Sequence, residues 1–349
     1  MTAKVAWRSP SNIAFIKYWG KHGVQLPKNP SLSMTLSKCF TDTSIVLGEK
    51  RTKKNIEFTF KFNSKENKKF SERIEEYLNQ VSGQLSFLNH YRLEISSENS
   101  FPHSAGIASS ASALSALALC LGTIEQRLGT AFKEDFYRRV SELARLGSGS
   151  ASRSLFAEYS VWGQTEHIYG SSDNFAVDLK VPIHPDFKCL RDIILLVDST
   201  EKKVSSSVGH GLMNNHPYAL TRFSEAGKNL KEIIASMRSG DFDKFAFILE
   251  HEALSLHAMM MTANPWYTLL SSNSLVIMQK IKEFREKTKS KISFTLDAGP
   301  NVHVIYPAEE EKKVQTFIES ELVPLCVDNK YIVGSIGRGP EMLVDEFTR

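Results

Sequence analysis

Apolar and polar residues alternate one by one over a short stretch near residue 60. Its apolar members are Ile56, Phe58, Phe60 and Phe62, each separated from the next by one polar residue. A period of two is typical of a strand with one buried face. The sequence therefore predicts a strand here, and we expect it to belong to a hairpin.

A period near that of an α-helix replaces this alternation in several longer stretches. It predicts helices over Phe70–Val81, Glu134–Leu146, Tyr218–Ser236, Phe242–Met261, Ser274–Lys287 and Glu309–Leu322. Short apolar runs between turn residues predict strands over Arg92–Ile95, Ile193–Val197, Ile292–Leu296 and Val302–Tyr306. Because strands and helices alternate without an internal repeat, the expected fold class is α+β, with helices layered on mixed sheets.

One helix is expected to begin in an unusual way. The segment Phe101–Leu121 opens with Pro102, continues through Ser, Ala and Gly residues, and then becomes an apolar helix that Gly122 should end. Farther along the chain, the turn-rich segment Val181–Phe187 contains two prolines. We place a domain boundary there, which gives an amino-terminal domain of residues 1–187 and a carboxy-terminal domain of residues 188–349.

The composition is that of an ordinary globular protein, with 349 residues, 42% of them hydrophobic, and a formal net charge of +4. These values exclude a disordered chain, a collagen-like repeat and a small disulfide-stapled domain. A surplus of four positive charges is too small for nucleic-acid binding through net charge alone, although it suits a pocket for an anionic small molecule.

The cysteines and the apolar runs indicate where in the cell the protein is expected. The four cysteines lie far apart without a CxxC pair, which argues against a zinc cluster or a disulfide framework and fits a reducing cytoplasm. The start of the sequence lacks the apolar core of a signal peptide, and the longest mostly apolar run, Ala113–Leu121, is too short to span a bilayer. We therefore expect a soluble, cytoplasmic protein without a membrane partner.

Basic residues gather between Lys50 and Lys69, on both sides of the first predicted strand. Such a cluster could contact nucleic acid or the phosphates of a nucleotide. The favoured interpretation is a solvated sheet edge, whose lysines discourage strand-to-strand aggregation.

Two loops of small residues could bind an anion, although the common nucleotide motifs are missing. The sequence has no GxxxxGK[ST] P-loop and no GxGxxG after a strand. In Pro102–Ala111, glycine permits close backbone approach, and hydroxyls meet the positive end of the helix dipole. This segment is either an anion cradle or a helix cap with a tight packing face. Gly147–Ser154 also carries Arg153, whose guanidinium suits a carboxylate or phosphate, with a surface turn as the alternative.

Other charged residues lie next to apolar runs. Lys17 and Lys21 bracket Tyr18-Trp19-Gly20, and Lys17 follows a strand-like run that would hold it near the end of a sheet. Asp297 stands between two predicted strands, where a carboxylate could act as a base or orient a reacting hydroxyl. Each also has a simpler interpretation, as an exposed lysine or a turn residue.

One apparent metal motif fails on its spacing. His251, Glu252 and His257 look superficially like a zinc-protease helix. That motif needs histidines four residues apart, which brings both to one helix face, and here they are six apart. We therefore reject metal binding at these residues.

Five segments together resemble the motifs of the diphosphomevalonate decarboxylase family, which belongs to the GHMP small-molecule kinase superfamily. In chain order they are NIAFIKYWGK (12–21), FPHSAGIASSA (101–111), GSGSASRS (147–154), HAMMMTANP (257–265) and DAGPN (297–301). The first and last are specific to this family, whereas the PxxxGxxSS part of the second is shared across the superfamily. The resemblance covers nearly the whole chain.

The resemblance implies a fold and a reaction. The fold has two lobes with substrates between them, the amino-terminal lobe like domain 2 of ribosomal protein S5 and the carboxy-terminal lobe ferredoxin-like. The implied enzyme uses ATP and Mg²⁺ to phosphorylate the C3 hydroxyl of mevalonate 5-diphosphate. It then releases phosphate and CO₂ to give isopentenyl diphosphate, in the mevalonate route of isoprenoid biosynthesis. Relatives of this kind are commonly homodimers.

The resemblance also assigns roles to residues. Asp297 would be the catalytic aspartate beside the C3 hydroxyl, Lys17 the lysine next to it, and Arg153 the arginine that grips the substrate carboxylate. The other positions that face the substrate are Tyr18, Lys21, Ser148 and Ser150. The positions around the ATP phosphates are Gly106, Ala108, Ser109 and Ser110. The sequence names no definite Mg²⁺ ligand.

The sequence departs from the family pattern at residue 30. Pro30 replaces a serine of the family, which removes a hydroxyl and a backbone donor.

Two other functions were weighed against the decarboxylase. The nearer one is a GHMP-type kinase that phosphorylates mevalonate or a phosphomevalonate without decarboxylation. The other is a noncatalytic RNA-binding protein, which would leave the Asp297 motif and both serine loops unexplained. Because Lys17, Arg153 and Asp297 are all present, the decarboxylase is favoured.

Overall fold

The structure is a computed structural model that describes residues 2–102, 107–129, 135–198 and 204–348. Its strands are β1 (Thr2–Ile16), β2 (Lys21–His22), β3 (Leu26–Pro27), β4 (Ser31–Glu49), β5 (Glu57–Phe62), β6 (Tyr91–Asn99), β7 (Tyr159–Trp162), β8 (Ala176–Asp178), β9 (Leu190–Leu195), β10 (Ser293–Thr295), β11 (Val302–Pro307), β12 (Tyr331–Ser335) and β13 (Glu341–Thr348). Its α-helices are α1 (Lys68–Val81), α2 (Ser109–Arg127), α3 (Phe136–Gly147), α4 (Pro185–Lys188), α5 (Ser206–Leu212), α6 (Ala219–Ser239), α7 (Phe242–Met261), α8 (Ser272–Thr288) and α9 (Glu311–Phe317).

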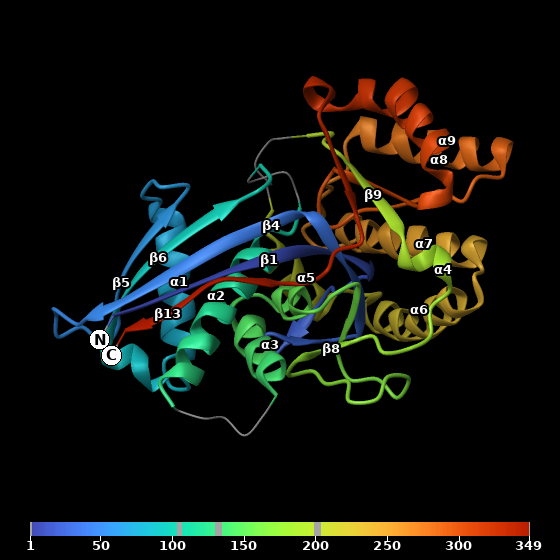
Figure 1. The fold of residues 1–349 in the computed structure, drawn as a ribbon. Helices are drawn as coiled ribbons and strands as arrows, with labels where there is room; N and C mark the ends of the chain where they lie inside the picture. The colour runs from blue at the N-terminus through green and yellow to red at the C-terminus, as the bar shows by residue number, and fades with distance from the viewer. Residues whose placement is uncertain (1, 103–106, 130–134, 199–203, 349) are drawn as a thin grey trace.

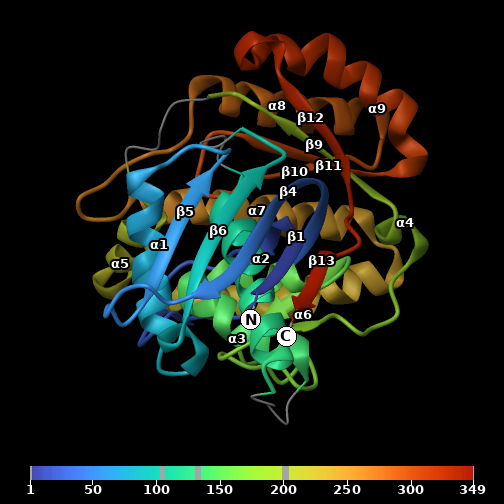
Figure 2. The same ribbon diagram turned by 60° about the vertical axis from the view of Figure 1, so that its left-hand side comes forward.

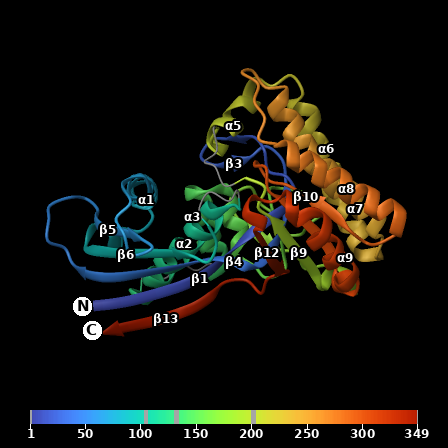
Figure 3. The same ribbon diagram turned by 90° about the horizontal axis from the view of Figure 1, so that it is seen from above.

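The larger sheet is built around the two long strands β1 and β4. Its order is β13-β1-β4-β6-β5, and β7 pairs with both β4 and β8. Helices α1, α2 and α3 lie on one face of this sheet (Figure 3). There Ile45 and Leu93 of the strands join Leu117 and Leu143 of the helices in one core cluster. The chain ends lie side by side because β1 and β13 pair, with Thr2 opposite Thr348 (Figures 1 and 2).

The smaller sheet has the order β10-β11-β9-β12 and is antiparallel throughout. Ile193 and Val304 pack with residues of α8 and α9 in one cluster. Ile194 and Ile305 belong to another cluster, which also contains residues of α6 and α7 and, from the ends of β1 and β4, Phe15 and Met34. This shared core joins the two sheets, and it sets the end of β1 close to the end of β10.

The structure confirms the α+β class and the positions of the helices and strands predicted from periodicity. The predicted helix Glu309–Leu322 is α-helical only over Glu311–Phe317, which is followed by the π-helix Ile318–Leu322, and Glu134 lies outside the described residues. The agreement is closest for α7, whose bounds Phe242–Met261 are those expected. The apolar pattern did not indicate the full length of β1 and β4. None of the helices in the described part of the chain combines the length and the apolar character needed to cross a bilayer.

The predicted hairpin near residue 60 is wrong. The strand is present as β5, but it pairs with β6 in parallel, and α1 lies between the two strands in the chain. A parallel pair cannot be joined by a tight turn, and α1 supplies the crossover that it needs. β5 is an edge strand, and the exposed residues Arg51, Lys53 and Lys54 precede it, as the solvated-edge interpretation predicts.

The expected end of a helix at Gly122 is also wrong, because α2 continues to Arg127. Gly122 is buried inside this helix, where α3 crosses it closely. A Cβ atom at this position would lie 2.6 Å from Cγ2 of Val140. The glycine therefore permits close packing of two helices and does not end either of them.

Candidate active site

Two side chains of opposite charge meet where the two sheets come together. Lys17 directly follows β1, Asp297 follows β10, and Nζ of the lysine lies 3.0 Å from Oδ1 of the aspartate. Lys17 is 1% exposed and also donates to the carbonyl of Ala14 at 2.5 Å. Burial lowers the pKa of Lys17, and the carboxylates of Asp297 and Glu252 oppose that shift. The aspartate side chain keeps 27% of its surface open, so a ligand can reach it.

Arg153 completes this group from the 3-10 helix Gly149–Leu155. It is buried, and its Nη1 donates to Oγ of Ser31 at 2.8 Å. Burial lowers the pKa of Arg153 to about 10, while the nearby charges of Asp297 and Tyr18 oppose the shift. Its Nε has no hydrogen-bond partner among the described residues. A buried guanidinium with an unused donor is suited to an anionic ligand. The structure thus brings Lys17, Arg153 and Asp297 together.

Helix α7 supports the pair with Glu252 and His257, for which the sequence had suggested no role beyond the rejected zinc site. Oε2 of the fully buried Glu252 accepts the backbone N–H of Lys17 at 2.9 Å. The same carboxylate accepts two bonds from Arg222, at 3.0 and 2.5 Å. Nε2 of His257 lies 3.1 Å from the carbonyl oxygen of Asp297. Both halves of the Lys17–Asp297 pair are therefore fixed through their backbone.

The other residues expected to face the substrate are Tyr18, which directly follows Lys17 in the chain, and Lys21, Ser148 and Ser150. The Tyr18 ring packs edge-on against Trp162, and its buried hydroxyl has no partner within the described residues. Burial raises the pKa of Tyr18 far above its usual value. Burial also lowers the pKa of Lys21, and the charge of Arg73 on α1 adds to that shift. The hydroxyl of Ser148 lies 3.2 Å from that of Ser150.

The start of α2 adjoins this group. Oγ of Ser110 lies 3.4 Å from Oγ of Ser148, which links the two serine loops. Ala108 precedes Ser109 at the start of the helix and provides no side-chain cap. The first N–H groups of an α-helix need partners from outside the helix, and an anion supplies them. Gly106, the remaining predicted phosphate-loop residue, lies outside the described residues.

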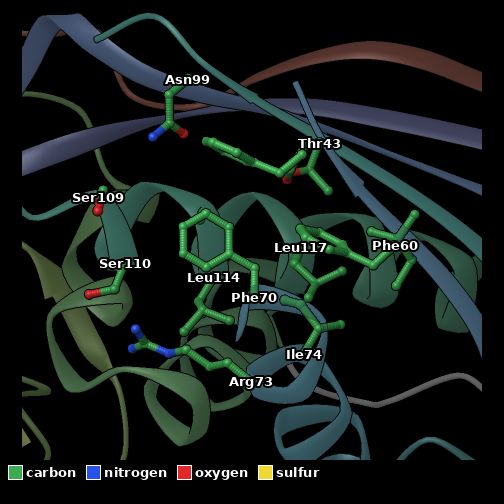
Figure 4. Close-up of a pocket in the computed structure, with 14 residues that line it drawn as sticks. Thr43, Phe60, Phe70, Arg73, Ile74, Asn99, Ser109, Ser110, Leu114 and Leu117 are labelled. Carbon is green, nitrogen blue, oxygen red and sulfur yellow. The ribbon is translucent and has the colours of Figure 1, made fainter. Parts of the chain in front are cut away.

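An apolar pocket of about 570 Å³, counting its open mouth, lies next to the start of α2 (Figure 4). Its walls include Phe60, Phe70, Ile74, Asn99, Leu114 and Leu117, and both Ser109 and Ser110 line it. Arg73 extends from α1 toward Ser110 in this view. Partial burial lowers the pKa of Arg73, although part of its surface is open to solvent. Arg73 could not be recognised from the sequence, because its position in a helical pattern suggests only a solvated face.

His210 on α5 is a second residue that the sequence did not reveal. Its Nδ1 accepts the backbone N–H of Gly20 at 2.9 Å, and its ring lies beside both Tyr18 and Trp19. Burial lowers the pKa of His210 to about 3, and the charges of Lys21 and Arg153 act in the same direction. The imidazole is therefore neutral at ordinary pH.

Acid should destabilise the protein through His210. Below its ordinary pKa of 6.5 an unfolded chain takes up a proton at this residue, whereas the folded chain stays neutral until about pH 3. The free energy of unfolding then falls as the pH decreases through that window. Between about pH 7.5 and about pH 5 the loss from this residue should be about 2 kcal/mol. Urea unfolding of the wild-type and His210→Leu proteins measures this loss. An identical pH dependence of the free energy of unfolding in both proteins would contradict the prediction.

The fold defines an α+β protein of the GHMP small-molecule kinase class, in which the uncapped start of α2 lies next to Ser148 and Lys17 pairs with Asp297. Comparison with known proteins narrows this class. The family model for the diphosphomevalonate decarboxylase-like N-terminal domain matches residues 9–176, and that for the mevalonate 5-diphosphate decarboxylase C-terminal domain matches residues 192–343. The chain belongs to the diphosphomevalonate decarboxylase family.

Relatives and solved structures agree with this membership. The diphosphomevalonate decarboxylase of Ganoderma lucidum is 31% identical over 329 residues, which are 89% of this chain and 80% of the relative. The structure of mevalonate diphosphate decarboxylase from Staphylococcus aureus is 30% identical, has a TM-score of 0.83 and covers 99% of both chains. The structure of MDDEF in complex with MVAPP, AMPPCP and magnesium is 29% identical, with a TM-score of 0.83 over 98% of this chain and 99% of that chain. The predicted family and fold are confirmed.

Proposed function

We propose that the chain catalyses the ATP-dependent decarboxylation of mevalonate 5-diphosphate to isopentenyl diphosphate. The observation that carries the proposal is the buried Lys17–Asp297 pair with Arg153 beside it, in a chain of this family. The names of the relatives support the substrate and the reaction. The similar structure with MVAPP, AMPPCP and magnesium supports ATP and Mg²⁺ as the nucleotide and the metal.

In the first step the C3 hydroxyl of the substrate attacks the γ-phosphorus of ATP, and the bond from that phosphorus to the oxygen of ADP breaks. Asp297 accepts the hydroxyl proton or orients the hydroxyl for attack. Lys17 favours the ionised carboxylate and stabilises negative charge on the transferred group. Because Lys17 is held by Glu252 and Ala14 as well as Asp297, this charge needs little reorganisation during the reaction.

In the second step the bond between the carboxylate carbon and C2 breaks, and CO₂ leaves. The electron pair of that bond forms the C2–C3 double bond as the C3–O bond to the new phosphate breaks. In this proposal Arg153 grips the carboxylate and holds it in line with the departing phosphate, a contribution of position to rate. Its free Nε and its depressed pKa both fit a guanidinium that is completed by an anion.

The donors around the pair suit a substrate with two anionic ends. Tyr18, Lys21, Ser148 and Ser150 supply hydroxyl and ammonium donors for its diphosphate and carboxylate. The hydroxyls of Ser109 and Ser110 fit the oxygen ligands that Mg²⁺ prefers, next to the nucleotide phosphates. When bound, the metal neutralises phosphate charge during transfer.

The nucleotide base belongs, in this proposal, in the apolar pocket of Figure 4, with Arg73 contacting the phosphates. Arg73→Gln should therefore raise the KM for ATP about tenfold, because a charge-assisted hydrogen bond is lost. Steady-state kinetics measure this change. Lys68→Gln on the same helix is the matched control, since the Lys68 side chain is 92% exposed and outside the pocket. Equal KM values for ATP in both variants would remove Arg73 from the site.

One assay tests the reaction directly. The purified protein is given ATP, Mg²⁺ and mevalonate 5-diphosphate labelled at the carboxylate carbon, and labelled CO₂, ADP and inorganic phosphate are measured. The proposal requires one CO₂ and one phosphate for each ADP. ADP without CO₂ would instead identify a kinase that phosphorylates a mevalonate compound.

The remaining features of the proposal concern organisation. We keep the domain boundary after residue 187, which falls between the two stretches matched by the family models.

A homodimer is supported by an exposed apolar row on α7, formed by Phe247, Leu254 and Met261. The four cysteines are free thiols, which supports a reducing cytoplasm. Sedimentation analysis of the wild type and Phe247→Glu tests the dimer.

A further inference from the structure

We propose that His210 is a positioning residue, which fixes the segment Tyr18–Lys21 and with it the groups that hold the substrate's diphosphate. The proposal rests on the proposed function, because that function places the diphosphate beside Tyr18 and Lys21. His210 lies on α5, outside the five segments that resemble the family motifs.

His210 contacts three successive residues of that segment. The centres of its ring and the Tyr18 ring are 4.3 Å apart, and those of its ring and the Trp19 ring are 4.6 Å apart. Its Nδ1 accepts the N–H of Gly20, a residue with a φ angle of 103°. Such an angle is in the left-handed region that favours glycine, so the chain turns sharply here. One side chain therefore holds both the aromatic residues and the turn that leads to Lys21.

The backbone of α5 is itself fixed against the same residues. A Cβ atom on Gly209 would lie 2.4 Å from Cζ2 of Trp19 and 2.5 Å from the hydroxyl oxygen of Tyr267. The helix thus lies in direct contact with Trp19, and this contact fixes the backbone that carries His210. The packing of α5 and the three contacts of His210 together hold the segment in place.

The absence of charge on His210 is part of this role. Lys21, Arg73 and Arg153 already bring positive charge to the site. Because Nδ1 accepts a hydrogen bond from Gly20, the single proton of the neutral ring lies on Nε2. A neutral acceptor can fix the Gly20 N–H without adding another cation beside Lys21, and an ammonium or guanidinium has no acceptor to offer.

The test compares two variants of His210 with a buried histidine elsewhere. His210→Leu removes the acceptor, and His210→Asn keeps an acceptor near the place of Nδ1. His216→Leu is the matched control, since His216 is 7% exposed against 8% for His210, and its Nδ1 accepts from Tyr218, away from the substrate segment. His210→Leu should raise the KM for mevalonate 5-diphosphate about tenfold or more and change the KM for ATP less than about twofold. His210→Asn should restore most of the loss.

Several outcomes would overturn the proposal. They are an unchanged substrate KM in His210→Leu, equal increases in both KM values, no rescue by His210→Asn, or the same substrate effect in His216→Leu. Circular dichroism melting confirms that each variant is folded before its kinetics are compared. Calorimetric titration with mevalonate 5-diphosphate separates the two proposals. A wild type that binds this compound without releasing CO₂ refutes the proposed function, whereas an unchanged Kd in His210→Leu refutes the role of His210.

Discussion

Asp297→Asn should reduce turnover by about 10²- to 10⁴-fold, the range expected when a positioned acid–base group is lost. The change keeps the size of the side chain and removes its charge. The amide can neither accept the C3 hydroxyl proton nor pair with the Lys17 ammonium 3.0 Å away. Affinity for mevalonate 5-diphosphate should stay within about tenfold of the wild type, because the other donors of the site are untouched.

The measurement is single-turnover release of CO₂, together with the Kd of mevalonate 5-diphosphate. Asp328→Asn is the matched control, because Asp328 pairs with Lys330 on the surface and should leave turnover unchanged. Thermal unfolding shows whether a loss of activity comes from a loss of structure. Wild-type turnover in Asp297→Asn would end the assignment of this residue as catalytic.

Arg153→Ala should lower kcat/KM for mevalonate 5-diphosphate by about 10²- to 10³-fold, because both the grip on the carboxylate and its alignment are lost. The KM for ATP should change little, since Arg153 lies on the Asp297 side of the site and does not line the apolar pocket. Arg153→Lys keeps the charge without the planar fork, and we expect it to recover only part of the activity.

Initial rates with each substrate varied in turn measure this effect. Arg238→Ala, at an exposed position of α6, is the control for removal of an arginine away from the site. A selective loss of ATP affinity in Arg153→Ala would contradict its placement at the substrate carboxylate.

The helices were predictable because each buries an apolar stripe with a helical period, as in α1 and α7. The long strands β1 and β4 were not, because many of their buried side chains are polar. The hydroxyl oxygens of Thr43 and Ser97 are 2.5 Å apart, and those of Ser9 and Ser115 are 2.6 Å apart. Hydroxyls that satisfy one another can be buried at little cost, and they hide the alternation that marks a strand.

The structure brings together Lys17 and Asp297, which the sequence indicated as candidate site residues, but the sequence did not indicate several residues that lie around them. Lys17 and Asp297 stand in recognisable motifs, and the resemblance suggested that they lie together. Glu252, Arg73 and His210 belong to no such motif. Glu252 meets Lys17 across 235 positions of the chain, and His210 meets Gly20 across 190. Contacts of this kind follow from the packing of the two sheets, which no local pattern records.

The bond between Glu252 and the Lys17 backbone also limits how the protein can move. It ties the end of β1 to α7, and Arg222 ties the same carboxylate to α6. A wide hinge motion between the halves of the molecule would keep the Glu252–Arg222 pair but break the bond from Glu252 to the Lys17 N–H, and a buried N–H left without a partner costs about 1–3 kcal/mol. We therefore expect substrates to enter and products to leave through local rearrangement of surface segments, with the reacting groups staying assembled between turnovers.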